Sequence, residues 1–246
     1  IKVNITDESI TVENDGAGIP VVVHERQNMW VPQMVMGELL SGDNYDDSSS
    51  RVVGGRNGYG AKLANVFSTT FCVETVDSKA KKKYAQTWHN NMSVCCKPKI
   101  TSAKRKDYTR ITFAPDFAKF GLRGMTPDIK ALFEKRVYDL AGTTPKDVSV
   151  YLNSQKLPIK TFKQYCSMYF ADDGPQPVYE QINERWEVCV AMAPDQQHQH
   201  VSFCNAIYTS KGGEHVKTIV DSIAREIVPN KAFKDLDVKP SQVKNS

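Results

Sequence analysis

The most informative run of the 246-residue chain lies at residues 54–62 and reads Gly54-Gly55-Arg56-Asn57-Gly58-Tyr59-Gly60-Ala61-Lys62. Four glycines within seven positions let the backbone approach a ligand closely, because glycine has no Cβ and accepts positive φ angles. A helix that begins near Tyr59 would add its N-terminal amides and its dipole, which favour an anion. The run therefore predicts a phosphate-binding loop followed by a helix.

The spacing of these glycines excludes two common phosphate loops. A Walker loop ends in Gly-Lys followed by Ser or Thr, whereas Gly60 is followed by Ala61-Lys62-Leu63. The dinucleotide and kinase patterns need Gly-x-Gly-x-x-Gly, and the order here is Gly55-x-x-Gly58-x-Gly60. Taken alone, the run is also compatible with an ordinary surface loop, so the interpretation depends on a second motif.

That second motif lies upstream and reads Ile10-Thr11-Val12-Glu13-Asn14-Asp15-Gly16-Ala17-Gly18-Ile19-Pro20. The alternation of Ile10, Val12 and Asn14 predicts a strand that ends at Asn14, after which the glycines turn the chain. A side-chain amide at such a strand end can accept a hydrogen bond from the amino group of an adenine ring. Because Asn-Asp-Gly is also a common hairpin turn, this motif alone leaves both interpretations open.

Together, the two motifs resemble the ATP-binding domain shared by gyrase, heat-shock chaperones, histidine kinases and MutL proteins. In that superfamily the first motif binds adenine and the glycine-rich motif forms the phosphate lid. Further stretches resemble the ATPase region of eukaryotic type II DNA topoisomerases over nearly the whole chain. They are Tyr45-Asp46-Asp47, residues 69–75, Tyr138-Asp139-Leu140-Ala141-Gly142, Lys156-Leu157-Pro158 and Thr209-Ser210-Lys211-Gly212-Gly213-Glu214-His215.

The resemblance implies an α+β fold with two domains. A two-layer α/β sandwich of the gyrase type would occupy residues 1–165, without its N-terminal helix, and part of a smaller α/β transducer domain would occupy residues 166–246. The later pattern is consistent with this, since strands are predicted at residues 186–191 and 200–205, followed by a glycine turn and an apolar helix. The chain is long enough for two modest cores at 40% hydrophobic content. We expect it to be truncated at both ends.

The resemblance also implies which residues bind ATP. Asn14 and Thr109 would hold the adenine, and Asn44 would close a lid over the nucleotide. Backbone amides would hold the triphosphate, with Lys62 and Arg56 opposing its charge. Gly42 and Asp43 stand where many relatives have serines, which puts two hydroxyl contacts in doubt. The full expected set is Asn14, Asn44, Arg56, Asn57, Gly58, Tyr59, Gly60, Ala61, Lys62 and Thr109.

Binding groups of this kind stabilise charge on the γ-phosphate but do not activate water. In the family, a glutamate general base and a magnesium-binding asparagine lie upstream of the segment that this sequence covers. A lysine that reaches the γ-phosphate lies downstream, in a Gln-Thr-Lys stretch. We therefore expect no catalytic or metal-binding residue within residues 1–246. The parent protein would hydrolyse ATP with Mg²⁺, and this chain alone would be nearly inactive.

The implied activity is that of a DNA clamp. ATP binding would join two copies of this region around double-stranded DNA, and a separate domain would cut and rejoin a second duplex. We expect no membrane partner, and a location in the nucleus or in an organelle with its own DNA. Two alternatives are an ATPase of a mismatch-repair or chaperone relative, and a non-catalytic nucleotide-binding interaction module.

Charge and cysteine content constrain the function less. The net charge of +4 permits a nucleic-acid partner without indicating one. Basic residues at 79–83 and 97–106 could contact DNA, but a solvated hairpin tip and a crossover loop are the favoured interpretations, because no aromatic residues are interleaved. The six cysteines lack metal or redox spacing and are expected to be reduced thiols.

Overall fold

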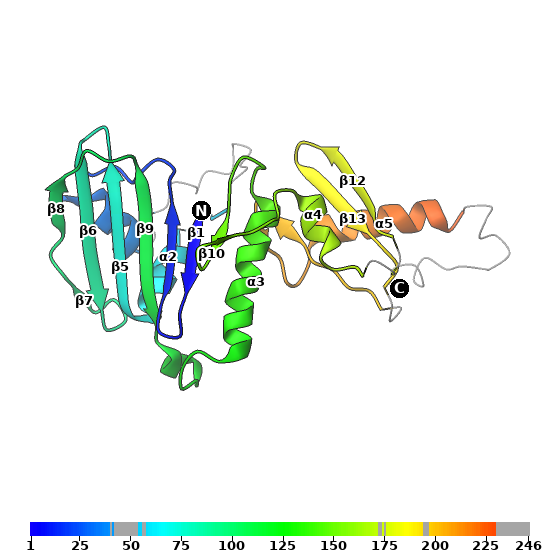
Figure 1. The fold of residues 1–246 in the computed structure, drawn as a ribbon, viewed down its shortest axis with the longest axis horizontal. Coiled ribbons are helices and arrows are strands. Elements are labelled where there is room, and N and C mark those ends of the chain that lie inside the picture. The colour runs from blue at the N-terminus through cyan, green and yellow to red at the C-terminus, as the bar shows by residue number, and fades with distance from the viewer. Residues whose placement is uncertain are drawn as a thin grey trace. The chain divides into compact units, whose positions relative to one another are not determined.

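The structure is a computed structural model that describes residues 1–39, 41, 54–55, 58–171, 174, 176–193 and 197–229 (Figure 1). The chain divides into two compact units. Unit 1 comprises residues 1–141 and 146–158, and unit 2 comprises residues 142–145 together with the described residues from 159 onward. The domain boundary that the sequence indicates, between residues 165 and 166, stays a prediction.

Unit 1 is built on a nine-stranded sheet in the order β11-β10-β1-β2-β9-β5-β6-β7, with β8 also paired to β6. The described pairs in this sheet are antiparallel except for β1 with β10, which is parallel. The strands are β1 (Lys2–Ile5), β2 (Ile10–Asn14), β5 (Ser68–Asp77), β6 (Lys82–His89), β7 (Val94–Cys95), β8 (Lys99–Ser102), β9 (Tyr108–Pro115), β10 (Tyr151–Leu152) and β11 (Gln155–Lys156).

The core of unit 1 lies between this sheet and two short helices, α1 (Val31–Gly37) and α2 (Gly60–Val66). Strand side chains alternate between the two faces, so every second residue of β5 and β6 points toward the helices. The resulting core cluster consists of Val21, Met36, Phe71, Val73, Tyr84 and Trp88, and Ala61 and Ala64 of α2 pack against it. This arrangement of one sheet and one helix layer confirms the expected α+β sandwich.

Three further features complete unit 1, and one of them, a small hairpin, packs Trp30 against the core cluster. The strands β3 (Val23–His24) and β4 (Met29–Trp30) form this hairpin, and η1 (Phe117–Phe120) is a short 3₁₀ helix. The helix α3 (Pro127–Thr143) begins with Pro127 and has Asp128 in its first turn, which matches the charge preference of a helix N-terminus. The sequence predicted a crossover loop at residues 97–106. Residues 99–102 instead form the short strand β8, so the prediction was wrong for them.

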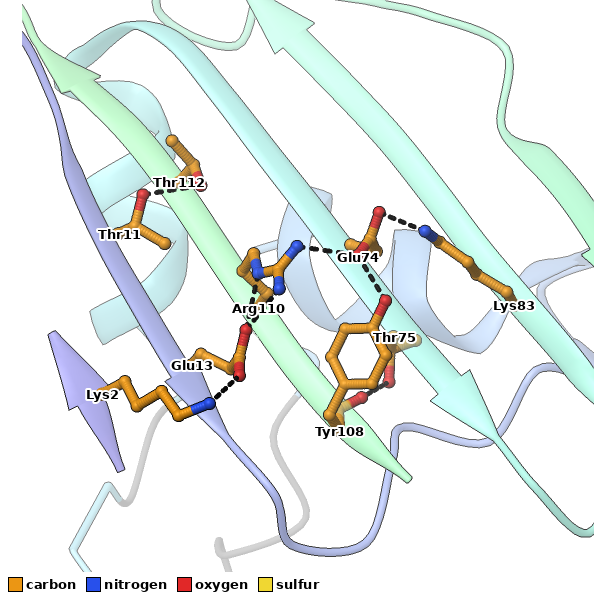
Figure 2. A network of polar contacts seen from close by, with 9 residues as sticks. All are labelled: Lys2, Thr11, Glu13, Glu74, Thr75, Lys83, Tyr108, Arg110 and Thr112. Atoms are coloured by element: carbon orange, nitrogen blue, oxygen red, sulfur yellow. Dashed lines mark hydrogen bonds and ion pairs between the residues drawn. The ribbon is translucent and has the colours of Figure 1, made fainter. Parts of the chain in front are cut away.

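The opposite face of the sheet carries a row of alternating charges (Figure 2). Lys2 Nζ lies 3.2 Å from Glu13 Oε1, Arg110 Nε donates to Glu13 Oε2 at 2.7 Å, and Arg110 Nη1 lies 3.2 Å from Glu74 Oε1. Lys83 Nζ lies 2.5 Å from the second oxygen of Glu74. Burial alone would raise the pKa of both glutamates, but these bonds outweigh it and hold each pKa below its ordinary value. Charges on this face are therefore paired across five neighbouring strands.

The described residues of unit 2 form two helices and two short hairpins. Its elements are α4 (Phe162–Ser167), β12 (Val178–Asn183), β13 (Trp186–Val190), β14 (Phe203–Cys204), β15 (Ile207–Tyr208) and α5 (Glu214–Ile227). The strand predicted at residues 186–191 and the helix after the glycine turn are confirmed. The strand predicted at residues 200–205 is shorter than expected, because only Phe203 and Cys204 pair with β15.

Tyr165 lies at the centre of unit 2, with 3% of its surface exposed. Its ring contacts those of Phe162, Tyr169 and Phe203, at centroid distances of 6.0, 5.4 and 5.8 Å. A Cβ at Gly142 would lie 2.5 Å from the Tyr165 ring, so a side chain is excluded there.

All six cysteines of the chain are free thiols, as expected. Among the described residues, no helix is long and apolar enough to span a membrane.

Replacing Phe71 with alanine should destabilise unit 1. The Phe71 side chain is 1% exposed and its ring meets that of Trp88 edge-on at 5.9 Å. Its loss should lower the free energy of unfolding by about 3–5 kcal/mol. Amide hydrogen exchange of peptides from β5 and β6 measures the change. Phe120→Ala makes the same substitution at a 56% exposed ring and should cost about 1 kcal/mol. Equal losses in the two variants would contradict the assigned core.

Candidate functional site

Three polar side chains form a row across neighbouring strands at one end of the sheet. Asn14, the last residue of β2, lies directly opposite Thr109 of β9, and Thr109 lies opposite Thr75 of β5. Residues directly opposite each other in an antiparallel pair share a face, here the face that α1 and α2 cover. Thr75 and Thr109 are buried, with their Oγ1 atoms 3.0 Å apart, whereas Asn14 is exposed. The row therefore places a polar strip on an otherwise apolar face.

Among the described residues, the Asn14 side chain makes one hydrogen bond. Its Oδ1 accepts a hydrogen bond from the backbone N–H of Gly16 at 3.2 Å, which closes a tight turn after the strand. An amide oxygen has two lone pairs, so Oδ1 keeps one for a ligand. Within the described part of the chain, the amide nitrogen of Asn14 makes no hydrogen bond. The predicted adenine-binding residue thus has both a donor and an acceptor available.

The loop that follows Asn14 is held against the end of β5. The Thr75 hydroxyl accepts a hydrogen bond from the N–H of Ile19 at 2.9 Å, and Asp77 Oδ2 accepts one from the N–H of Val21 at 3.0 Å. Between these two bonds, a Cβ added to Gly18 would lie 1.8 Å from the carbonyl oxygen of Val76. The second glycine of the Asn-Asp-Gly-Ala-Gly motif is therefore required for this close backbone crossing.

The glycine-rich run ends where predicted, because α2 begins at Gly60 with Tyr59 as its N-cap residue. Gly55 and Gly58 have φ angles of 90° and 63°, in the left-handed region that favours glycine. A Cβ at Gly55 or at Gly60 would meet no atom within 4 Å, so there is open space beside each Cα. Asn44, Arg56 and Asn57 fall outside the described residues, and their roles stay predictions.

Lys62, predicted to oppose phosphate charge, lies on the inner side of α2 with 2% of its surface exposed. Its Nζ donates to Ser41 Oγ at 2.7 Å, and Ser41 lies 2.9 Å from the carbonyl oxygen of Met34 in α1. Burial lowers the pKa of the Lys62 ammonium, and the nearby Glu38 carboxylate opposes that shift only in part. The ammonium therefore lies in a site where added negative charge would stabilise it.

The sequence position of α2 was predicted, but the orientation of its faces was not. Asn65 is also fully buried and donates from Nδ2 to the carbonyl oxygen of Met36 at 3.1 Å. On the outer side, Tyr59, Leu63 and Phe67 are 40%, 47% and 38% exposed. The inner side of α2 thus carries Lys62 and Asn65 beside Ala61 and Ala64, while Leu63 and the two capping residues Tyr59 and Phe67 are exposed.

Three residues that position the site were not singled out from the sequence, namely Ser41, Thr75 and Asp77, whereas Gly18 belongs to the turn that the sequence predicted. A signal existed for Thr75, since it continues the buried alternation of Phe71 and Val73 with a hydroxyl. Ser41 and Asp77 carry no sequence signal for this role, because the bonds that build the site join them to Lys62 and to the N–H of Val21, which lie far from them in the chain. Among the described residues, no group of three or more His, Cys, Asp or Glu side chains could hold a metal ion.

Comparisons with known proteins agree along the whole chain. A DNA gyrase B family model matches residues 148–245. DNA topoisomerase 2 of Saccharomyces cerevisiae is 43% identical over 265 residues, which cover 100% of this chain and 18% of that protein. DNA topoisomerase 2-alpha of Homo sapiens is 45% identical over 256 residues, covering 100% of this chain and 17% of that protein. The chain thus spans less than a fifth of the length of these curated relatives.

One solved structure extends the comparison to the fold. The crystal structure of the ATPase region of Saccharomyces cerevisiae topoisomerase II matches with a TM-score of 0.92 and 45% sequence identity. The match covers 99% of this chain and 64% of that chain. At this similarity, the order of the strands and the placement of the helices are shared by the two proteins.

Substituting Gly18 with alanine should destabilise unit 1, because the new methyl group would overlap the Val76 carbonyl. Displacing the loop should cost about 1–3 kcal/mol of unfolding free energy, measured by urea titration. Gly124→Ala is the matched control, since its Cβ would meet no atom within 4 Å, and it should change stability by less than about 0.5 kcal/mol. A neutral Gly18→Ala variant would rule out the close crossing.

Asp77→Asn should remove a pH-dependent part of the stability. The N–H groups of Ala80 and Val21 donate to the Asp77 carboxylate and hold its pKa below its ordinary value. A carboxyl group with a lowered pKa in the fold stabilises the protein above its unfolded pKa of about 3.9 and loses that contribution as the pH falls further. The stability difference between wild type and variant should therefore shrink between pH 6 and pH 3 in urea titrations.

The control for this comparison is Asp147→Asn, at an exposed loop position of the same unit. It removes the same charge and should show a smaller change in stability difference over that range. A difference for Asp77→Asn that stays constant from pH 6 to pH 3 would show that the backbone bonds do not depend on the carboxylate.

Proposed function

The chain belongs to the eukaryotic type II DNA topoisomerases, and we propose that it forms part of the ATP-binding region of an ATP-hydrolysing enzyme of this family. The observation that carries the proposal is the match to a topoisomerase II ATPase region over 99% of the chain at 45% identity. The parent protein would be a type II DNA isomerase, in which ATP binding closes a dimeric clamp and drives passage of one duplex through another.

Asn14 and Thr109 would bind the adenine ring. The two residues lie opposite each other on β2 and β9, which supports a shared contact with one planar group. Asn14 Oδ1 would accept a hydrogen bond from the exocyclic amino group, and the Thr109 hydroxyl lies beside it, bonded to Thr75. The loop from Asp15 to Val21 would cover the base, because the end of β5 holds it in place.

The start of α2 would bind the phosphates. The left-handed glycines at 55 and 58 and the open space around Gly55 and Gly60 leave room for a polyphosphate beside the backbone. Lys62 Nζ keeps donors beyond its bond to Ser41, and the phosphate charge would offset the desolvation that lowers its pKa. Arg56, Asn57 and Asn44 would add contacts from the segments outside the described residues.

The residues of this chain fit a role in holding ATP rather than in breaking it. Bound ATP supplies the phosphoanhydride bond, and Mg²⁺ offsets its charge. We propose that the general-base glutamate, the magnesium-binding asparagine and the γ-phosphate lysine lie outside residues 1–246, as the resemblance implies. The turnover of this chain alone should then be far below that of the parent protein.

Double-stranded DNA and a second copy of the chain are the proposed partners. The curated relatives are named DNA topoisomerase 2, which supports a DNA substrate for the parent protein. We place the protein in the nucleus, or in an organelle that holds its own DNA. An ATPase of the mismatch-repair or chaperone type gains no support from these relatives. A non-catalytic module would bind an ATP analogue without turnover by the full-length parent.

Calorimetric titration of a non-hydrolysable ATP analogue with Mg²⁺ tests the proposed site. Asn14→Ala should weaken binding about 2–10-fold and Lys62→Met about 10–100-fold, because the first removes a neutral hydrogen bond and the second a charged one. Lys62→Met keeps the length of the buried stem. Lys119→Ala, an exposed lysine in η1, is the control and should bind like wild type. Unchanged binding in both site variants, or none by the wild-type chain, would refute the assignment.

A further inference from the structure

We propose that unit 1 carries a second anion-binding surface, at the end of its sheet, which binds the phosphodiester backbone of duplex DNA. This surface, called here the basic end, consists of residues 78–81, which join β5 to β6, and residues 103–107, which join β8 to β9. The sequence places these two segments more than 20 residues apart, and the fold brings them together.

Two hydrogen bonds fix the segments to each other. The N–H of Ala103 donates to the carbonyl oxygen of Lys81 at 2.9 Å, and the N–H of Ser78 donates to Asp107 Oδ1 at 2.5 Å. Ala103 is buried beneath them, with 9% of its surface exposed. The basic end is therefore an anchored platform rather than the separate hairpin tip and crossover loop that the sequence alone favoured.

Four of the five cations of the basic end lack acidic partners among the described residues, and the fifth, Lys79, interacts with the Asp77 carboxylate. Lys79, Lys81, Lys104, Arg105 and Lys106 are all exposed. Within the described residues, Lys81, Lys104, Arg105 and Lys106 take part in no ion pair. The two nearby carboxylates are engaged by backbone N–H groups, those of Ala80 and Val21 at Asp77 and that of Ser78 at Asp107.

The adjacent face of the sheet differs from the basic end in the pairing of its charges. There, every cation of the row in Figure 2 is bonded to Glu13 or Glu74. Unpaired like charges held close together repel one another, and an anionic ligand relieves that repulsion. The same sheet thus neutralises its face and leaves a concentrated positive potential at its end.

The shape of the basic end suits a phosphate group. Ser78, Lys81, Ala103, Lys104 and Arg105 line a shallow hollow with a volume of about 380 Å³. A hydroxyl and three cationic side chains therefore border one concave site that is open to a long ligand. Neither segment contains an aromatic residue on which unpaired bases could stack, which favours a duplex backbone over a single strand. Contacts of this kind carry no sequence preference and weaken with salt.

This inference shares with the proposed function only the class of partner. The basic end makes no use of Asn14, Thr109 or Lys62, so the two assignments can fail separately. Loss of DNA binding with intact ATP-analogue binding concerns the basic end alone. Loss of analogue binding with intact DNA binding concerns only the nucleotide site.

Fluorescence anisotropy with a labelled 30-base-pair duplex, titrated with the 246-residue chain at several salt concentrations, tests the inference. The double variant Lys104→Ser/Arg105→Ser should bind about tenfold more weakly at 50 mM salt. Its slope of log affinity against log salt should fall by about 1.8, since each phosphate contact contributes about 0.9. Lys104→Arg/Arg105→Lys keeps both charges and should retain binding.

The matched control is Lys119→Ser/Arg123→Ser, which removes two exposed cations near the opposite end of β9. It should bind the duplex within about twofold of wild type. If both double variants lost duplex affinity equally, the loss would follow from the lower net charge alone, and the inference would be overturned. Wild-type affinity in Lys104→Ser/Arg105→Ser, or a chain that binds inorganic pyrophosphate but no duplex, would also overturn it. Calorimetry with the ATP analogue confirms that each variant is folded.

Discussion

The end of β5 is the constraint on which the nucleotide-binding face depends. Thr75 and Asp77 each accept a hydrogen bond from the loop after Asn14, and the backbone between them passes too close to Gly18 for any side chain. A hydrogen bond to a charged group contributes about 1.5–3 kcal/mol, so Asp77 accounts for much of this attachment. Because the loop is fixed at Ile19 and Val21, the chain that follows Asn14 is ordered without a ligand, which would lower the entropic cost of binding at the proposed site.

The buried lysine of α2 shows a second constraint. Burying an ammonium group costs free energy unless a partner compensates, and Lys62 has a neutral hydroxyl as its hydrogen-bond partner, with the Glu38 carboxylate near enough to influence its pKa. A structural lysine would gain more from an exposed position. Its burial beside the glycine-rich turn is consistent with the proposed contact to an anionic ligand, and Ala61 and Ala64 on the same side of α2 pack against the apolar core.

Local patterns predicted the elements of the site, and long-range packing decided how they meet. Alternating residues predicted the strand that ends at Asn14, and the glycine spacing predicted the start of α2. Neither pattern could show that Asn14 lies opposite Thr109, because the register of strands 95 positions apart in the sequence depends on the whole sheet. The family resemblance supplied that pairing, and the structure shows its geometric basis. The roles assigned to Asn44, Arg56 and Asn57 rest on the resemblance alone.

The distribution of charge explains why composition was a poor guide to partners. A net charge of +4 over 246 residues averages two different regions of one sheet. On the sheet face, cross-strand pairs bring cations and carboxylates together, and those pairs stabilise the sheet. At the strand ends, backbone N–H groups compete for the carboxylates of Asp77 and Asp107, and the neighbouring cations are left without them. The turn geometry itself therefore creates the positive surface, which a count of charges does not reveal.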